Sequence, residues 1–249
     1  MPDGPQRLLQ DEFDRAAEGF AERTKGRFDA MDVVSFARTM SGESIVEVGA
    51  GTGNFLALFK DVAARRVAID ITHGMLAEAR RRDPSLELIQ ADGSALPLRS
   101  GSIDLVTSAQ AFHHIHEPLP VLKEMRRVAG PDGRVLIVDQ IATERYEEMA
   151  FMTEVESLRD PSHAASRPAS VMRMLVLSAG LEIVDERLHE DQSRFSKWMW
   201  PGEFPAERIA KVREFVSKFG DETGMGFEPD GDDFTFTRRR LMLLANRPV

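Results

Sequence analysis

Three glycines, Gly49, Gly51 and Gly53, alternate with other residues directly after a short apolar run at residues 45–48. Glycine adopts backbone angles that other residues avoid, and its missing side chain lets a ligand approach the main chain closely. The pattern predicts a strand that enters this turn and continues into a helix at residues 55–60, with a ligand against the turn. An ordinary strand-to-helix turn is the competing interpretation, because glycine-rich matches alone give false positives.

The spacing of the glycines argues against a dinucleotide. The dinucleotide fingerprint requires glycine at position 54, where this chain has Asn54. An acidic residue, Glu47, also precedes the first glycine on the strand. A carboxylate there can orient the turn through backbone N–H groups, or face the cationic methionyl end of a ligand, more easily than it can face a pyrophosphate. NAD therefore fits the turn less well.

Two further carboxylates follow the next two apolar runs. Asp70 directly follows the run at residues 66–69, and Asp92 and Gly93 follow the run at residues 86–89. A carboxylate at the end of the strand beside a glycine turn accepts hydrogen bonds from both hydroxyls of a ribose. The second carboxylate is placed to accept one from an adenine amino group. Either aspartate alone would be interpreted as a solvated loop residue, but together with the glycine turn they predict an adenosyl ligand.

A fourth run, at residues 103–107, leads into the segment Phe112-His113-His114. Together with the glutamate, the glycine turn and the two aspartates, this segment resembles the class I S-adenosylmethionine-dependent methyltransferases of the ubiquinone and menaquinone biosynthesis type. The resemblance covers residues 11–139 and implies S-adenosylmethionine as the cofactor. It also implies a seven-stranded sheet with a reversed last strand. The C-terminal third carries no recognisable substrate motif, so the acceptor stays open.

The resemblance also implies a role for each cofactor-binding position. Glu47 stands at the end of the first strand, beside the turn. The other implied contacts are Gly49, Gly51 and Gly53 to the methionyl and ribose portion, Asp70 to the ribose, Ile71 and Met75 to the adenine faces, Asp92 and Gly93 to the adenine edge, and Gln110 to the methionyl end.

Five apolar runs, several of them rich in β-branched residues, alternate with segments of helical length. They lie at residues 45–48, 66–69, 86–89, 103–107 and 134–138. Such runs suit strands that are buried on both faces of a parallel sheet. Gly130 is placed to cap the helix before the fifth run. Repeated strand–helix units predict right-handed crossovers and a Rossmann-like, doubly wound α/β sheet, with the ligand crevice at the carboxyl ends of the strands.

The flanking regions are expected to surround this core within a single domain of residues 1–249. Residues 1–40 are predicted to form a helical lid, residues 41–140 the cofactor-binding core, and residues 141–249 the acceptor side with a helical insertion after strand five. The expected elements outside the core are helices at residues 10–38, 144–159, 168–179 and 203–219 and strands at residues 181–187 and 234–244.

Three histidines, His113, His114 and His116, crowd the loop after the fourth run. A metal site is disfavoured, because no cysteine assists, no H-E-x-x-H motif is present, and the resembled family has the paired histidines without a metal. These histidines are expected to pack or to contact the loop backbone. A turn-forming Asp-Pro pair holds His163 in the insertion after the fifth run, which in this architecture overhangs the acceptor. His163 is the predicted catalytic base, and a solvated loop histidine is the competing interpretation.

An aromatic and methionine-rich set is formed by residues 198–201, with Met149, Phe151 and Met152. These side chains could form a lid over an apolar acceptor, or they could simply belong to the core. The arginine triplets at residues 80–82 and 238–240 are interpreted as solvated positions on a helix and a strand, and no function is assigned to them.

Composition excludes several classes of protein. The formal charge is −9, from 41 acidic and 32 basic residues, and such an excess repels nucleic acid. No cysteine is present, so disulfides and thiolate metal sites are excluded. No leader-like pattern opens the chain, and no apolar stretch approaches the roughly 20 residues that span a bilayer. A cytoplasmic location is therefore expected.

The predicted activity is transfer of a methyl group from S-adenosylmethionine to a small-molecule acceptor by in-line displacement. A protein that binds S-adenosylmethionine or its demethylated product without catalysis is the first alternative. A nicotinamide-dependent oxidoreductase is a second, which the glycine spacing disfavours. The identity of the acceptor and the oligomeric state stay open.

Overall fold

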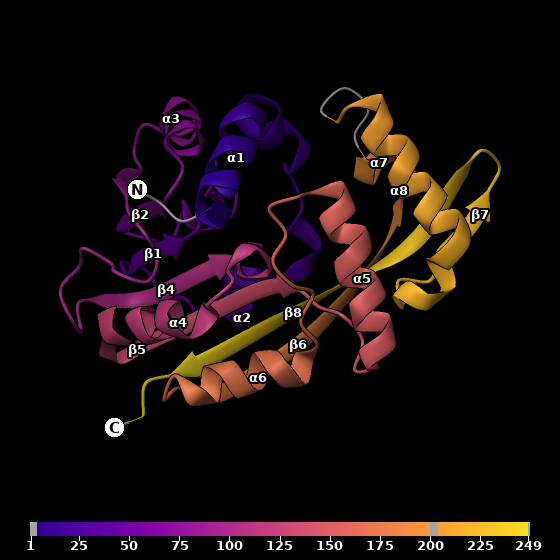
Figure 1. The fold of residues 1–249 in the computed structure, drawn as a ribbon. Helices are drawn as coiled ribbons and strands as arrows, with labels where there is room; N and C mark the ends of the chain where they lie inside the picture. Colours follow the sequence, from indigo (N-terminus) through magenta and orange to yellow (C-terminus); the bar gives the residue numbers. More distant parts are fainter. Residues whose placement is uncertain (1–3, 200–203, 249) are drawn as a thin grey trace.

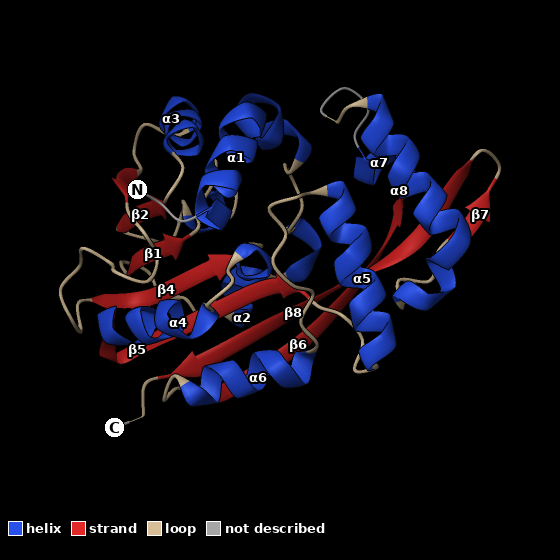
Figure 2. Ribbon diagram, viewed as in Figure 1, coloured by secondary structure: helices blue, strands red, loops and turns tan. Residues whose placement is uncertain are grey.

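The computed structural model describes residues 4–199 and 204–248 of the chain. Its centre is one sheet in the order β3-β2-β1-β4-β5-β8-β6, with helices on both faces (Figures 1 and 2). The strands are β1 Ser44–Val48, β2 Arg65–Asp70, β3 Glu87–Gln90, β4 Ile103–Ala109, β5 Ala129–Gln140, β6 Glu182–Arg194 and β8 Asp233–Asn246.

Strands β1 to β5 pair in parallel, and β8 runs antiparallel between β5 and β6. The predicted Rossmann-like sheet of seven strands with a reversed last strand is therefore confirmed. A further short strand, β7 (Glu228–Asp230), forms a hairpin with β8 that the sequence analysis did not anticipate. A turn at Gly231, whose φ is +61°, closes this hairpin.

Alternation along the strands divides the core into two layers. Val46 and Val48 of β1 face a cluster that also contains residues of α4 and α6, whereas Ile45 faces a second cluster with residues of α2 and α3. Both faces of β1 are buried, as expected for a central parallel strand. The helices that cover the sheet are α2 Val33–Phe36, α3 His73–Arg82, α4 Pro118–Val128 and α6 Ala169–Ser178.

Strands β6 and β8 extend beyond the parallel part of the sheet, and a third core cluster forms on this extension (Figure 1). Helices α5 (Tyr146–Arg159), α7 (Phe195–Met199) and α8 (Ala206–Phe219) contribute to it. Met152, Trp198 and Met199 are buried there, which supports the core interpretation of the aromatic and methionine-rich set. Residues 200 and 201 of that set lie outside the described residues.

The N-terminal region differs from the expected helix at residues 10–38. Helix α1 covers Gly4–Arg23, and only a 3₁₀ turn at Asp29–Met31 and the short α2 follow it. Gly26 and Asp32 have left-handed backbone angles, with φ of +69° and +49°. A continuous helix cannot pass through such residues, so the expected single helix was wrong.

Three other boundaries also differ. The helix expected after the glycine turn is only a 3₁₀ turn at Leu56–Phe59. Gly130 does not cap α4, because α4 ends at Val128 and β5 begins at Ala129, with an irregular register opposite Ile103. The helix expected at residues 203–219 begins at Ala206, and residue 203 lies outside the described residues. No helix in the described ranges is long and apolar enough to cross a membrane.

Candidate functional site

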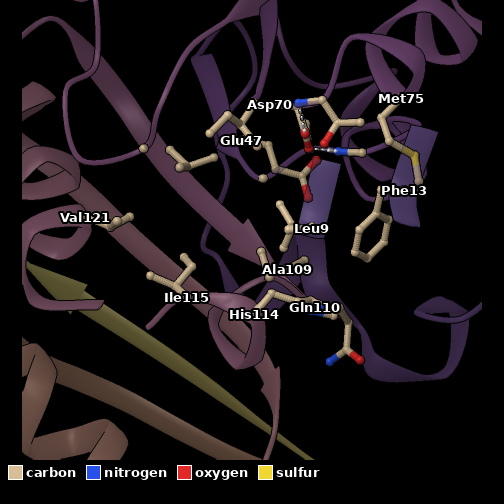
Figure 3. Close-up of a pocket in the computed structure, with 18 of the residues that line it drawn as sticks. Leu9, Phe13, Glu47, Asp70, Met75, Ala109, Gln110, His114, Ile115 and Val121 are labelled. Carbon is tan, nitrogen blue, oxygen red and sulfur yellow. Dashed lines mark hydrogen bonds between the residues drawn. The ribbon is translucent and has the colours of Figure 1, made fainter. Parts of the chain in front are cut away.

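A cavity of about 630 Å³ lies at the carboxyl ends of the parallel strands, and α1 lines its side (Figure 3). Its wall contains nine of the ten predicted cofactor positions. These are Glu47, Gly49, Gly51, Asp70, Ile71, Met75, Asp92, Gly93 and Gln110. Gly53 is the exception. A Cβ on Gly53 would lie 3.0 Å from Leu86 Cδ1, so this glycine serves the packing of the turn against the strands.

The glycine turn is shaped by backbone angles and by close contacts. Gly49 has a φ of +73°, and a Cβ there would lie 2.6 Å from the Cβ of Ala111, which is too close for any side chain. Gly51 has a φ of +52°, but a Cβ there would meet only Met75 Sδ and Phe20 Cε1, both at 4.0 Å. The protein therefore leaves open space above Gly51, where a ligand can approach the main chain.

Asp70 holds the glycine turn and the following loop together. Its carboxylate accepts hydrogen bonds from the amides of Gly51 (2.7 Å) and Thr72 (2.8 Å), which Figure 3 draws as dashed lines. The hydroxyl of Thr72 and the amide of Ile71 also donate to this carboxylate, which lines the cavity. Glu47 also accepts a backbone hydrogen bond, from Leu56 directly after the turn, so both carboxylates contact this segment.

The buried carboxylate of Glu47 and the half-buried carboxylate of Asp70 face the same cavity. Burial, and then the charge of Asp70, raise the pKa of Glu47 well above its ordinary range. Burial also raises the pKa of Asp70, although hydrogen bonds from Thr72 and Gly51 oppose this. One oxygen of Glu47, Oε2, is buried without a hydrogen-bond partner. A ligand with cationic or N–H and O–H groups would satisfy this site, whereas a pyrophosphate would be repelled.

Helix α1 is fixed over the cavity by polar contacts. The side-chain amide of Gln10 donates to the carbonyl of Ile71 (3.0 Å), and the carboxylate of Asp14 accepts from the amide of Gly74 (2.8 Å) at the start of α3. Asn54 donates to the carbonyl of Ala21 (2.9 Å). Asn54, which disqualified the dinucleotide fingerprint, thus ties the end of α1 to the glycine turn.

Apolar side chains of α1 complete this wall. Phe13 and Phe20 line the cavity and contact each other edge to face, with ring centroids 5.6 Å apart. The helical spacing of these residues was the only sequence signal for their shared face.

Gln110 stands where the first cavity meets a second one. It has a φ of +53°, an unusual angle for a residue other than glycine, and its Nε2 is buried without a hydrogen-bond partner. Strained backbone of this kind gathers at functional sites. An orphaned amide donor beside the glycine turn fits the carboxylate of a methionyl group, so the residues present suit the expected cofactor.

A histidine–aspartate pair lies beneath this junction. Asp139, at the end of β5, accepts hydrogen bonds from the backbone N–H of Phe112 (2.6 Å) and of Gln140 (2.7 Å), and contacts His113 Nδ1 at 2.6 Å. Burial raises the pKa of Asp139 to about 6, so the carboxylate is ionised at neutral pH. Burial and the neighbouring imidazoles hold the pKa of His113 well below its ordinary value. A neutral His113 therefore donates Nδ1–H to Asp139 and keeps Nε2 as an acceptor.

The sequence analysis did not single out Asp139. The only available signal was an aspartate at the end of the fifth strand.

His163, the predicted base, is buried beside this pair. Its ring centroid lies 5.6 Å from that of His113, and its Nε2 is 3.1 Å from Ser166 Oγ. It lines neither the first nor the second cavity. Burial lowers the pKa of His163 to about 4, so its imidazole is a weak base. The competing interpretation of a solvated loop histidine was wrong, because the side chain is 6% exposed. Its catalytic role stays a prediction.

The burial of His163 predicts how the stability of the protein depends on pH. Its pKa is about 4 in the folded protein and 6.5 ordinarily, so the unfolded chain takes up a proton first as the pH falls. His163 therefore stabilises the fold above pH 6.5, and this contribution is lost between pH 6.5 and pH 4. We expect His163→Asn to lose less of its free energy of unfolding than the unmodified protein across this window.

Urea unfolding at several pH values measures this difference. The matched control is His73→Asn, because His73 is exposed at the start of α3. An identical pH dependence in His163→Asn and the unmodified protein would show that His163 is not buried in the neutral form.

A second cavity of about 610 Å³ adjoins the first. Both cavities are lined by Phe13, Phe20, Arg27, Gln110 and His114, so these residues form a shared boundary. The remaining wall comes mainly from α1, the end of α5, α7, the start of α8 and the extended parts of β6 and β8.

The arginine triplets differ in their surroundings. Arg238 and Arg240 of β8 line the second cavity, and Arg240 is 3% exposed, so the expectation of solvated positions was wrong for both. The triplet at residues 80–82 forms the last turn of α3, and within it Arg81 pairs with Glu78 on the helix surface.

Comparisons with known proteins also indicate a methyltransferase. Residues 46–137 match the family model described as a methyltransferase domain. The chain is 25% identical over 220 residues to the uncharacterized methyltransferase YcgJ of Bacillus subtilis, covering 85% of this chain and 87% of that protein. The solved structure of YcgJ superposes with a TM-score of 0.80 at 22% identity, covering 87% of this chain and 97% of that one.

Two other relatives extend the comparison. The demethylmenaquinone methyltransferase of Renibacterium salmoninarum is 34% identical over 107 residues, which is 43% of this chain and 45% of that protein. The phosphoethanolamine N-methyltransferase 2 of Haemonchus contortus, solved in complex with S-adenosyl-L-methionine, shares the fold with a TM-score of 0.61 at 14% identity, over 87% of this chain and 51% of that one. Together the matches support an S-adenosylmethionine-dependent methyltransferase, with a methyltransferase domain at residues 46–137.

Proposed function

We propose that this enzyme methylates a small molecule that enters the second cavity. The observation that carries this proposal is the shared boundary: Gln110, His114 and Phe13 line both cavities, so a donor in one can face an acceptor in the other. A volume of about 610 Å³ is in the range of small-molecule pockets.

In this proposal the predicted residues hold the donor in the first cavity. Asp70 binds the ribose hydroxyls, Asp92 the adenine amino group, and Ile71 and Met75 the adenine faces. Glu47 and the orphaned amide of Gln110 orient the methionyl end. S-adenosylmethionine supplies a methyl group already activated by its sulfonium charge. The main task of the protein is then alignment, which contributes as much as about 7–11 kcal/mol in well-oriented reactions.

A base is needed when the acceptor is a hydroxyl or amine group. The geometry favours His113 for this role over His163, because His113 lines the second cavity and His163 does not. Asp139 holds the His113 ring with Nδ1 protonated, which leaves Nε2 to accept the proton of the acceptor. His163, predicted from the sequence as the base, would in this proposal support the ring of His113 instead.

The acceptor of the demethylmenaquinone methyltransferase is not carried over to this chain. The aligned part is under half of either protein. The second cavity lies largely outside the matched residues 46–137, in the α1 segment and in β6 and β8. Its many charged side chains are also a poor match for an isoprenoid quinone.

Binding and turnover test the proposed function. We expect calorimetry to show binding of S-adenosylmethionine and S-adenosylhomocysteine, and weaker or undetectable binding of NAD, because four carboxylates line the first cavity. A metabolite extract incubated with enzyme and isotope-labelled S-adenosylmethionine should then yield a small product that has gained one labelled methyl group. The control is the same extract without enzyme. Binding of the donor with label appearing only in protein or nucleic acid would contradict a small-molecule acceptor.

A further inference from the structure

The second cavity is strongly basic in a chain whose formal charge is −9. Nine arginine and lysine side chains line it, against three carboxylates. The carboxylates are already engaged: Glu12 pairs with Arg15 and Arg208, and Asp191 pairs with Arg240. The third, Asp160, accepts from the hydroxyl and amide of Ser162. The positive charge of this cavity is therefore not balanced by its own lining.

Two arginines at the centre of this charge lack an ionic partner. Within the described ranges, neither Arg27 nor Arg238 forms an ion pair with a carboxylate. Arg27 contacts the ring of Phe20, with its guanidinium 5.9 Å from the centroid. Burial, and then the charges of Arg238 and Arg240, lower the pKa of Arg27. Burial and Arg240 lower the pKa of Arg238 to about 10, although the charges of Glu156 and Asp191 oppose this. The cations thus repel one another across the cavity, a cost that a bound anion would offset.

The unsatisfied polar atoms of this wall point to the same ligand. Three residues that line the second cavity, Gln140, Trp198 and Arg240, each have a buried side-chain N–H donor without a hydrogen-bond partner. Arg159 Nε lies 3.5 Å from Glu156 Oε2, and the amide of Gln110 is assigned to the methionyl end of the donor. Buried donors normally have acceptors, and no unpartnered buried side-chain acceptor of the described residues lines this cavity. The missing partner is therefore rich in acceptor oxygens.

We propose that the methyl acceptor carries an anionic oxygen group, a carboxylate or a phosphate, which Arg27 and Arg238 bind in the second cavity. This inference rests on the proposed function. Guanidinium groups form two parallel hydrogen bonds to either group, and such charge-assisted bonds are stronger than neutral ones. Arg27 lines both cavities, so it holds the anion near the point of methyl transfer. The preference of the first cavity for a cationic donor and of the second for an anionic acceptor assigns each substrate to its own side.

Paired probes test the charge requirement without knowledge of the natural acceptor. Benzoate and phenyl phosphate carry the two anionic groups, and benzamide and benzyl alcohol are their neutral counterparts. We expect calorimetry on the enzyme saturated with S-adenosylhomocysteine to show binding of at least one anion at least tenfold tighter than that of its neutral counterpart. The anion that binds more tightly shows whether the site prefers a carboxylate or a phosphate. Equal binding of charged and neutral probes would overturn the proposal.

Two variants on one strand locate the binding. Arg238→Gln should weaken the preferred anion at least tenfold, and it should fold, because it removes one of several repelling charges. Arg239→Gln is the matched control: successive side chains on a strand face opposite sides, and Arg239 pairs with Glu190 instead. Both variants should bind S-adenosylhomocysteine as the unmodified enzyme does. Unchanged anion binding in Arg238→Gln, or equal losses in both variants, would overturn the assignment.

The labelled product from the metabolite extract separates this inference from the function on which it rests. We expect the methylated product to be retained by an anion exchanger at neutral pH. A methylated small molecule that passes through unretained would leave the proposed function standing and overturn the anionic acceptor. Donor binding without any methylated small molecule would overturn the proposed function itself, whatever the probes show.

Discussion

Replacing Asp70 by alanine should weaken binding of S-adenosylmethionine by about 1.5–3 kcal/mol, the range for hydrogen bonds to a charged group. The carboxylate accepts from the amides of Gly51 and Thr72, and it lines the first cavity. The variant therefore loses both the proposed ribose contact and the clamp that holds the glycine turn. Calorimetric titration with S-adenosylmethionine and S-adenosylhomocysteine measures the loss.

Asp104→Ala is the matched control for this experiment. Asp104 also accepts hydrogen bonds from a backbone amide and a hydroxyl, both of Ser44, but it lies at the opposite end of β1 from the glycine turn. The Asp104→Ala variant should lose some stability and keep its donor affinity unchanged. Equal donor affinity in Asp70→Ala and the unmodified enzyme would place the ribose elsewhere. Equal losses of donor affinity in both variants would show that Asp70→Ala acts only by lowering the stability of the sheet.

The cofactor side of this enzyme was predictable because its determinants are local in sequence. Gly49 and Asp70 directly follow apolar runs, Asp92 follows another run after two intervening residues, and the carboxyl ends of parallel strands meet at one edge of a sheet. Identifying the strands therefore sufficed to bring these residues to one cavity.

The second cavity was not predictable in the same way. Its wall joins α1 to the distant strands β6 and β8, and only the pairing of Asp191 with Arg238 in the register of β6 and β8 brings that region together. The alternation that turns Arg238 and Arg240 inward and Arg239 outward has meaning only once the cavity face of β8 is known. As a triplet in the sequence, these arginines look like solvated charge.

The contacts of the histidine cluster could be predicted only in part, for the same lack of long-range information. The proximity of His113 and His114 to each other is visible in the sequence, but their contacts with Asp139 and His163 cross 26 to 50 residues of chain. His163 was chosen for its place in the insertion after the fifth strand. The structure shows that the insertion folds over His113, because the amides of Ala164 and Ala165 donate to the carbonyl of His113.

Asp139→Asn should lower the turnover number by about 10²–10⁴-fold, the usual contribution of a general base. The amides of Phe112 and Gln140 donate to different oxygens of Asp139, so asparagine keeps the acceptor for Phe112 and loses the one for Gln140. Its other atom becomes an NH₂ donor facing His113 Nδ1, which can then only accept. The proton of the imidazole moves to Nε2, the atom proposed to accept the proton of the substrate, and the base is lost while the fold is kept.

Two measurements distinguish this loss of base function from a structural effect of Asp139→Asn. The ¹⁵N chemical shifts of the His113 ring should show Nδ1 protonated in the unmodified enzyme and Nε2 protonated in the variant. Donor affinity should be unchanged, because Asp139 does not line the first cavity. In the unmodified enzyme, turnover should also fall as the pH drops below about 6, where the Asp139 carboxylate takes up a proton and no longer orients His113. His163→Asn, which leaves this hydrogen bond intact, is the matched variant. A tautomer switch with full turnover would show that the acceptor needs no base, and a larger loss in His163→Asn than in Asp139→Asn would return the catalytic role to His163.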